Sequence, residues 1–256
     1  MFFFLCSRVF IKLPAVMPFF KSTQLTPQCT KLLDVKSQKC GLRHTVYATN
    51  GDKYTGEWQN NQKHGTGTQI WKESGASYNG EWKFGKPDGY GNYCVLVSKT
   101  KKYMYQYSGN WKNGKKHGYG RYFYDNSAVY EGDWSENHRT GLGKMYYGNG
   151  DIYHGEWMMD KCHGKGSLQY ANGNWYEGDW QDGKKNGNGK FCYPDKGRIY
   201  KGFWVDGVAK CGTLSYFGKD DAPTPTNHPI PQLQLVDMEL VLRDAQAANF
   251  DQRSKK

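Results

Sequence analysis

Apolar and polar positions alternate along most of this chain, and the alternation returns every 23 to 29 residues. The recurring unit is Tyr-x-Gly-x-Trp, then a turn that carries a basic residue, then Gly-x-Gly, as in NGDIYHGEWMMDKCHGKG at 149–166. A fixed period of this kind predicts a repeat array rather than a globular domain. Seven copies are present, and their tryptophans are Trp58, Trp82, Trp111, Trp134, Trp157, Trp180 and Trp204.

Each copy is predicted to be a β-hairpin. A period of two places Tyr, Gly and Trp on one face of the outgoing strand and acidic or other polar residues on the opposite face. On the returning strand we expect both glycines to share the aromatic face with the residues two and four positions further on, such as Leu168 and Tyr170. A strand without Cβ atoms leaves room for a flat ring to lie on its backbone. The sequence therefore predicts one aromatic face and one polar face.

Successive hairpins are expected to lie side by side, so that equivalent residues form long ladders and do not gather in a pocket. The Asn-Gly pairs at 50–51, 149–150 and 172–173 are turn signals, and we expect them to join one hairpin to the next. With 32 glycines, the chain is suited to a thin array rather than to a large core. The predicted fold class is all-β: an elongated, single-layer antiparallel sheet of repeated β-hairpins, twisted and open at both ends, with a short C-terminal helix.

The repeats divide the chain into five predicted segments. Residues 38–218 form the array, with an N-terminal half-repeat as a cap, and the last copy is degenerate because Cys211 and Thr213 stand where the two glycines are expected. A basic insertion at 98–102 lengthens one step of the period. The other segments are a disordered N-terminal extension at 1–37, a proline-rich linker at 219–235, an amphipathic helix at 236–250 and a disordered tail at 251–256.

The start of the chain is apolar but is interrupted by Arg8, Lys12 and Pro14. A secretory signal carries its positive charge before an unbroken apolar run, and a membrane span needs about 20 consecutive apolar residues. The start of this chain meets neither requirement. A weak membrane-surface anchor stays open as an alternative. The seven cysteines are odd in number and irregular in spacing. This argues against a disulfide framework or a zinc site and predicts a reducing, cytoplasmic setting.

The motif Tyr-x-Gly-x-Trp, a lysine-bearing turn and Gly-x-Gly, at a 23-residue period, resembles the MORN repeat, and the resemblance covers about residues 42–218. It implies the elongated single-layer sheet inferred above. It also implies non-enzymatic roles: scaffolding, self-association, binding of a partner in a groove, and phospholipid binding. The settings implied by the resemblance are sperm and cilia, with spermatogenesis, the acrosome, cytoplasmic vesicles and the flagellum among them.

The aromatic face is the first candidate site, because a single sheet cannot bury both of its faces and a large exposed apolar patch marks an interaction surface. The expected occupants are a helix or an extended segment of a partner protein, a second copy of the array, or the helix at 236–250. The alternative is that the rings pack only on neighbouring rings and glycines. The residues assigned to this protein-binding face are Tyr107, Trp111, Tyr130, Trp134, Tyr153, Trp157, Tyr176 and Trp180.

The basic turns are the second candidate site. The formal net charge of +11 favours anionic partners, and a lysine near an acidic leaflet contributes about 1 kcal/mol. The alternative is that soluble sheets keep charge at their turns. Nucleic acid is disfavoured, because repeat packing accounts for the aromatic residues that could stack on bases. The residues assigned to binding acidic phospholipids are Lys115, Lys116, Arg139, Lys161, Lys184 and Lys185.

No enzyme chemistry is predicted. His64, His117 and His163 recur just before Gly-x-Gly in the first, third and fifth copies. At a strand spacing of about 4.8 Å successive ones are roughly 20 Å apart, whereas zinc ligands lie within about 2.3 Å of one ion. The acidic residues are spaced just as evenly, and no phosphate-binding loop or nucleophile motif stands in its strand–helix context. We expect no catalytic residue, no metal and no cofactor.

Overall fold

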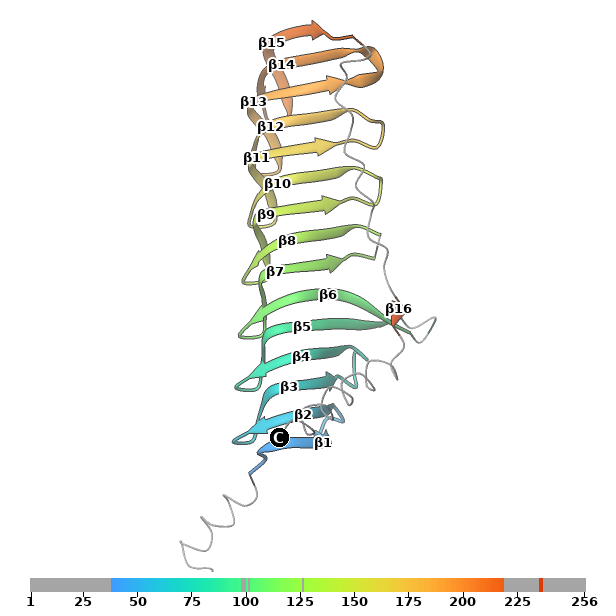
Figure 1. The fold of residues 1–256 in the computed structure, drawn as a ribbon, viewed down its shortest axis with the longest axis vertical. Helices are drawn as coiled ribbons and strands as arrows, with labels where there is room; N and C mark the ends of the chain where they lie inside the picture. The colour runs from blue at the N-terminus through green and yellow to red at the C-terminus, as the bar shows by residue number, and fades with distance from the viewer. Residues whose placement is uncertain (1–37, 98–99, 101, 126, 219–234, 237–256) are drawn as a thin grey trace, which may run out of the picture. The chain divides into compact units, whose positions relative to one another are not determined.

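The computed structural model describes residues 38–97, 100, 102–125, 127–218 and 235–236. Strands β1 to β15 lie in one sheet in the order of the sequence, each paired antiparallel with the next. Figure 1 shows them as successive rungs. This arrangement confirms the predicted fold class. The described part of the chain contains no helix that is long and apolar enough to cross a membrane.

Each repeat supplies an outgoing and a returning strand. β1 (Gly41–Tyr47) precedes the first repeat and pairs with β2, and η1 (Pro194–Lys196), a short 3-10 helix, lies between β13 and β14. The hairpins are β2 (Lys53–Gln59) and β3 (Gln62–Ile70), β4 (Ser77–Lys83) and β5 (Lys86–Val97), β6 (Lys102–Lys112) and β7 (Lys115–Phe123), β8 (Val129–Ser135) and β9 (His138–Tyr146), β10 (Ile152–Met158) and β11 (Lys161–Gln169), β12 (Trp175–Gln181) and β13 (Lys184–Tyr193), and β14 (Arg198–Val205) and β15 (Val208–Tyr216).

The turn inside each hairpin has two residues, both with positive φ, as in Asn113 and Gly114 at 51° and 82°. This is the mirror-image turn whose twist matches that of the flanking strands. Between hairpins the connection is longer: Gly150 donates its N–H to the carbonyl of Tyr147, and Tyr147 donates to the carbonyl of Asp151, each at 2.9 Å. The same pattern surrounds 172–173. These Asn-Gly pairs therefore join one hairpin to the next, as predicted.

A bulge in the returning strand separates the two glycines of Gly-x-Gly. In β11 the pairing shifts after the Gly155–Gly166 pair, so that Gly164 stands in the bulge with a φ of 59°. A Cβ at Gly166 would meet the Tyr153 ring, whereas a Cβ at Gly164 would meet the Glu156 carboxylate. The prediction that both glycines share the aromatic face is therefore wrong for the first glycine, because the bulge reverses the alternation of faces.

The last hairpin keeps this architecture with one residue fewer. Gly202 pairs with Gly212, one position earlier than the spacing of the other copies predicts. A Cβ at Gly212 would meet the Tyr200 ring, so Gly212 occupies the place of the second glycine. The prediction that Cys211 and Thr213 stand in the two glycine positions is wrong, because the bulge of this returning strand is one residue shorter.

Two residues near the C-terminus belong to the same sheet. β16 (Leu235–Val236) pairs antiparallel with β6, opposite Met104 and Tyr103. These two residues end the predicted linker and begin the predicted helix, and the rest of both segments lies outside the described residues. So do the predicted extension at 1–37, the tail, and positions 98, 99 and 101 of the basic insertion. On either side of that insertion, β5 and β6 have 12 and 11 residues, more than their counterparts in other repeats.

Candidate functional site

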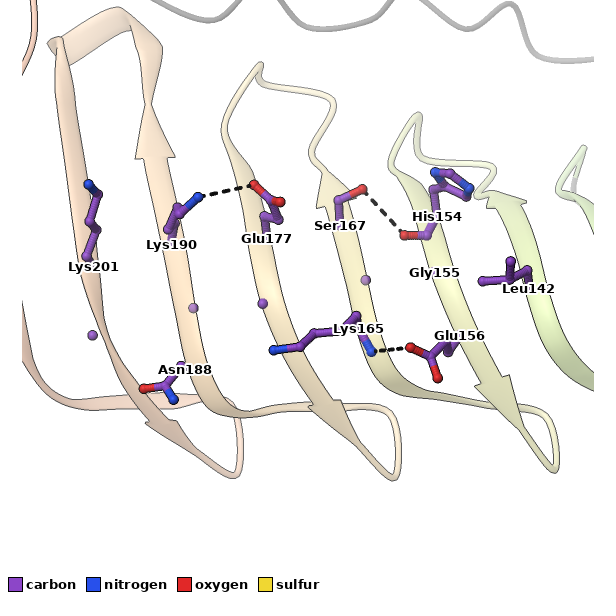
Figure 2. A pocket seen from close by; sticks show the side chains of 14 residues that line it. Leu142, His154, Gly155, Glu156, Lys165, Ser167, Glu177, Asn188, Lys190 and Lys201 are labelled. Atoms are coloured by element: carbon purple, nitrogen blue, oxygen red, sulfur yellow. Dashed lines mark hydrogen bonds and ion pairs between the residues drawn. The ribbon is translucent and has the colours of Figure 1, made fainter.

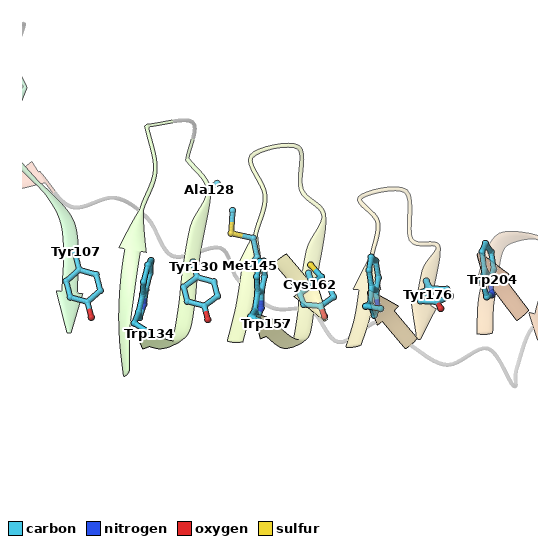
Figure 3. Close-up of a cluster of buried hydrophobic side chains, with 11 residues drawn as sticks. Tyr107, Ala128, Tyr130, Trp134, Met145, Trp157, Cys162, Tyr176 and Trp204 are labelled. Atoms are coloured by element: carbon cyan, nitrogen blue, oxygen red, sulfur yellow. The ribbon is translucent and has the colours of Figure 1, made fainter. Parts of the chain in front are cut away.

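The tyrosines and tryptophans of Tyr-x-Gly-x-Trp form one continuous aromatic row. The Tyr153 ring meets Trp157 of its own repeat edge-on at 5.2 Å between centroids, and Trp180 of the next repeat at 5.1 Å. Figure 3 shows this alternation along the row. Contacts of this kind contribute about 0.5–1.5 kcal/mol beyond burial, and they link each repeat to the next from Tyr54 to Trp204.

Most rings of the row also form a hydrogen bond to the backbone. The Tyr153 hydroxyl donates to the carbonyl of Glu156 at 3.0 Å, and the Trp157 indole donates to the carbonyl of Gly143 in the preceding repeat at 3.2 Å. The tyrosine bond recurs in the first six repeats. Burial raises the pKa of Tyr176 to about 12, so this hydroxyl keeps its proton and remains a donor at neutral pH.

The structure brings all eight residues of the predicted protein-binding face into this row and buries most of them. Tyr130, Tyr153 and Tyr176 are 0% exposed. Among the eight, Trp111 alone is half-buried and the others are buried. These residues therefore form the core of the sheet, and ring-on-ring packing accounts for their recurrence. They are not the atoms that a partner would touch first.

A second row of apolar side chains packs against the aromatic row and is half-buried. Its members occupy positions two and four beyond the second glycine of their repeats, so they lie on the aromatic face. The sequence pattern places them on this face but did not mark them as a site, because a period gives the face of a strand and not the depth of a side chain. We call them the outer row: Tyr93, Tyr122, Tyr124, Tyr147, Leu168 and Phe191.

Three of the six predicted lipid-binding residues turn inward over the aromatic row. Their charged groups lie 4.3–5.0 Å from the indole of the following repeat: Lys116 over Trp134, Arg139 over Trp157 and Lys185 over Trp204. Burial lowers the pKa of Lys116 to about 8. Arg139 is held in addition by Asp160, whose carboxylate accepts the Nε proton at 3.0 Å. Cation–π attraction favours this placement, and it removes the three charges from the turn edge.

The other three predicted lipid-binding residues are exposed at the turns, and each is paired with an acid in the turn of the following repeat. The pairs are Lys115 with Glu136, Lys161 with Asp182 at 3.1 Å, and Lys184 with Asp206 at 3.3 Å. Exposed pairs of this kind contribute only about 0–1 kcal/mol, but they neutralise part of the charge at the edge. The structure therefore does not bring the six residues together as one free basic surface.

The polar face carries an open groove of about 910 Å³ that spans β9 to β14 (Figure 2). Its rim alternates in charge, with Glu177 and Lys190 3.8 Å apart. Glu156 accepts the N–H of Lys165 at 2.9 Å and so holds the bulge of its own repeat. We interpret these carboxylates as structural, because the same bond recurs at Glu81, Asp133 and Asp179.

Groups for metal or nucleophile chemistry are dispersed. His64, His117 and His163 lie on β3, β7 and β11, and the described residues contain no group of three or more His, Cys, Asp or Glu that could hold a metal ion. Burial raises the pKa of Cys162 to about 11, so its thiol is neutral and a weak nucleophile at pH 7. The described cysteines are all free: Cys40, Cys94, Cys162, Cys192 and Cys211.

Comparison with known proteins finds matches over most of the chain. The family model described as MORN repeat matches residues 54–75, 78–94, 107–129, 130–152, 153–175 and 176–198. MORN repeat-containing protein 3 of Xenopus laevis is 52% identical over 91% of this chain and 98% of that protein. The protein of that name from Mus musculus is 64% identical over 90% and 95%. The SAS-4 (dCPAP) TCP domain of Drosophila melanogaster, solved with a proline-rich motif of Ana2, matches with 12% identity and a TM-score of 0.35, covering 90% of this chain and 97% of that one.

Proposed function

Since this chain belongs to the family of MORN-repeat proteins, we propose that it is a non-enzymatic scaffold that holds protein partners against the aromatic face of its sheet. The observation that carries the proposal is the outer row. It is apolar, half-buried and continued from repeat to repeat, and a contiguous apolar surface of this kind is typical of an interaction site.

The partner is expected to touch the outer row and not the buried aromatic row beneath it. Tyr122 and Phe191 lie against Trp134 and Trp204 at 5.9 and 6.2 Å between centroids, so the aromatic row fixes the position of the outer rings. Rings held in place lose little conformational entropy on binding. A helix or an extended segment that lies along several repeats could place an apolar side chain on each.

Binding of acidic phospholipids through the turn edge is the second candidate, and it has weaker support. Half of its basic residues lie over indoles, and the other half are paired with acids. For the cellular setting we propose the cytoplasm of sperm or ciliated cells, on the strength of the family resemblance.

The test is quantitative capture of partners by the full chain from a testis extract. Tyr124→Ser combined with Leu168→Ser removes two outer-row contacts. The matched control, Tyr119→Ser combined with Leu142→Ser, removes apolar side chains that are 52% and 62% exposed outside the aromatic row. We expect the first pair to lose the captured proteins and the second to retain them. Equal capture by both pairs would overturn the aromatic-face assignment.

Lipid binding is separated from protein binding by a flotation assay with vesicles that contain phosphatidylserine. Under the scaffold proposal, the triple change of Lys115, Lys161 and Lys184 to Gln leaves partner capture intact. If the wild type floats and this variant neither floats nor captures partners, the turn edge is the functional surface and the scaffold proposal fails.

A further inference from the structure

A basic side chain covers most tryptophans of the array. The basic residue belongs to the preceding hairpin, where it pairs with that hairpin's own tryptophan. For the first tryptophan, Trp58, it comes from the segment before β1. The covered indoles and their cations, at 4.3–5.0 Å, are Trp58 with Lys39, Trp82 with Lys63, Trp134 with Lys116, Trp157 with Arg139 and Trp204 with Lys185.

Trp111 and Trp180 break this pattern, since no cation of the described residues lies over either indole. The positions that would supply one hold Pro87, opposite Trp82, and Cys162, opposite Trp157. The short side chain of Cys162 is itself buried and does not reach over the next ring as Arg139 does.

Beside Trp180 lies a hollow of about 700 Å³ on the aromatic face, and Cys162 is among the residues that line it. The side chains of Tyr147, Leu168 and Trp180 form its apolar wall. Cys162, which also lines it, occupies the position that holds a basic residue in other repeats. Asp151 is the one charged residue among the described residues that line it. The carboxylate oxygens of Asp151 accept the N–H of Ala171 and the side-chain amide of Asn149, each at 2.9 Å, so the negative charge is held in a fixed place.

We propose that this hollow binds an arginine or lysine side chain of a partner segment that lies along the aromatic face. The inference rests on the proposed scaffold function and adds a recognition element to it. Aromatic faces attract cations most strongly where water is excluded, and the carboxylate of Asp151 supplies the complementary charge. The chain itself provides the template for the cation, because Arg139 lies over Trp157 one repeat earlier.

Neighbouring cations do not prevent this binding. Arg139 and Lys185 stand over the tryptophans on either side of Trp180. Lys116 and Arg139 already occupy adjacent repeats within the chain, so the row accepts cations at successive positions. A bound basic side chain would complete the series from Trp134 to Trp204.

The test is an NMR titration of the full chain, followed at the indole N–H of Trp180 and assigned with Trp180→Phe. The probes are acetyl-Gly-Gly-Arg-Gly-Gly-amide and its citrulline twin, which has the same shape without the charge. We expect the arginine peptide to bind about fivefold more tightly or better, the size of one partly desolvated cation–π contact. Equal affinities would overturn the proposal.

Variants show whether the hollow is the site. Cys162→Arg supplies the missing cation from within, so we expect it to weaken binding of the arginine peptide at least tenfold and to raise the melting temperature. Cys162→Ser keeps the hollow open and should bind like the wild type. Ala209→Arg adds the same charge at the equivalent position of the last repeat, where no further tryptophan follows, and should also bind normally. Undiminished binding by a folded Cys162→Arg variant would refute the site.

The capture assay separates this inference from the scaffold proposal. If capture depends on Tyr124 and Leu168 but the arginine peptide shows no preference over citrulline, the scaffold stands and the cation site fails. If the peptide preference is seen but capture is unaffected by the outer row, the hollow binds a guanidinium but the scaffold fails, and with it the assignment of the bound cation to a partner segment.

Discussion

An interior repeat and the last repeat of the array carry the same motif in different surroundings. In β10, Tyr153 and Trp157 are 0% and 5% exposed and contact rings of both adjacent repeats. In the last hairpin Tyr200 is half-buried, and all nine residues of β15 are exposed. The difference teaches that a repeat is buried by its neighbour along the chain and not by its own hairpin, as expected for a quasi-linear array.

The last repeat also lacks polar contacts that the interior repeat makes. The Trp157 indole donates to the carbonyl of Gly143, whereas the buried indole nitrogen of Trp204 has no hydrogen-bond partner among the described residues. Glu156, which holds the bulge of the interior repeat, is replaced in the last repeat by Phe203. An end repeat thus keeps the shape of the motif while it lacks several of the contacts that fix that shape, which is usual for terminal units.

The largest effect is expected when a ring of the aromatic row is removed. Trp134→Ala should lower the free energy of unfolding by about 3–5 kcal/mol, because it leaves a cavity between Tyr107 and Tyr130. Trp204→Ala should cost less, because its indole N–H has no hydrogen bond to lose among the described residues and its neighbour Tyr200 is only half-buried. Urea unfolding followed by circular dichroism measures both. Equal losses would contradict the contrast between interior and end.

A methyl group at the second glycine should have the next largest effect. In Gly166→Ala the new Cβ meets the Tyr153 ring, and overpacking of this kind costs about 1–3 kcal/mol. In Gly212→Ala the Cβ would meet the backbone of β14 at Lys201 and Gly202 as well as the Tyr200 ring. Because β15 is an edge strand and can move away, a cost on the order of 1 kcal/mol is expected. Thermal unfolding of the two variants compares them; a greater loss at Gly212 would show that the edge strand is not the more adaptable one.

Loss of the carboxylate at the bulge should have a smaller effect. Glu156→Gln weakens a charge-assisted hydrogen bond to the N–H of Lys165, and at this exposed site we expect a cost on the order of 0.5–1 kcal/mol. Phe203→Glu should bring no gain, because the last bulge is one residue shorter and does not present the same N–H. Hydrogen exchange at the amide of Lys165 reports the first change directly, and unaltered protection there would contradict it.

The smallest effect is a dependence on pH. Burial lowers the pKa of Lys116 from 10.5 to about 8 in the folded chain, so between these values the unfolded chain binds more protons and stability rises with pH. Lys116→Met should reduce this rise between about pH 8 and about pH 10.5, measured by urea unfolding at each pH. Lys184→Met, at an exposed turn position, is the control and should keep the rise of the wild type.

The basic residues show where prediction from the sequence ends. Lys115 and Lys116 are adjacent and were assigned to the same edge, yet one is paired with Glu136 at the surface and the other lies over Trp134. Adjacent residues of a strand point to opposite faces of the sheet. Which of the two points to the aromatic row depends on the bulge that follows in the returning strand. The bulge also places the first glycine of Gly-x-Gly on the polar face. A regular alternation of faces does not predict a bulge, because the bulge interrupts that alternation.

By itself, the sequence determined the repeat, the hairpins, the order of the strands and the face on which the aromatic residues lie, because period and alternation are local properties of a strand. Only the tertiary structure decided which rings are buried, where Gly212 pairs, and which indoles a cation covers. These features depend on contacts between one repeat and the next. For example, Cys162 stands where other repeats have a basic residue, and this changes the surroundings of Trp180 in the following repeat.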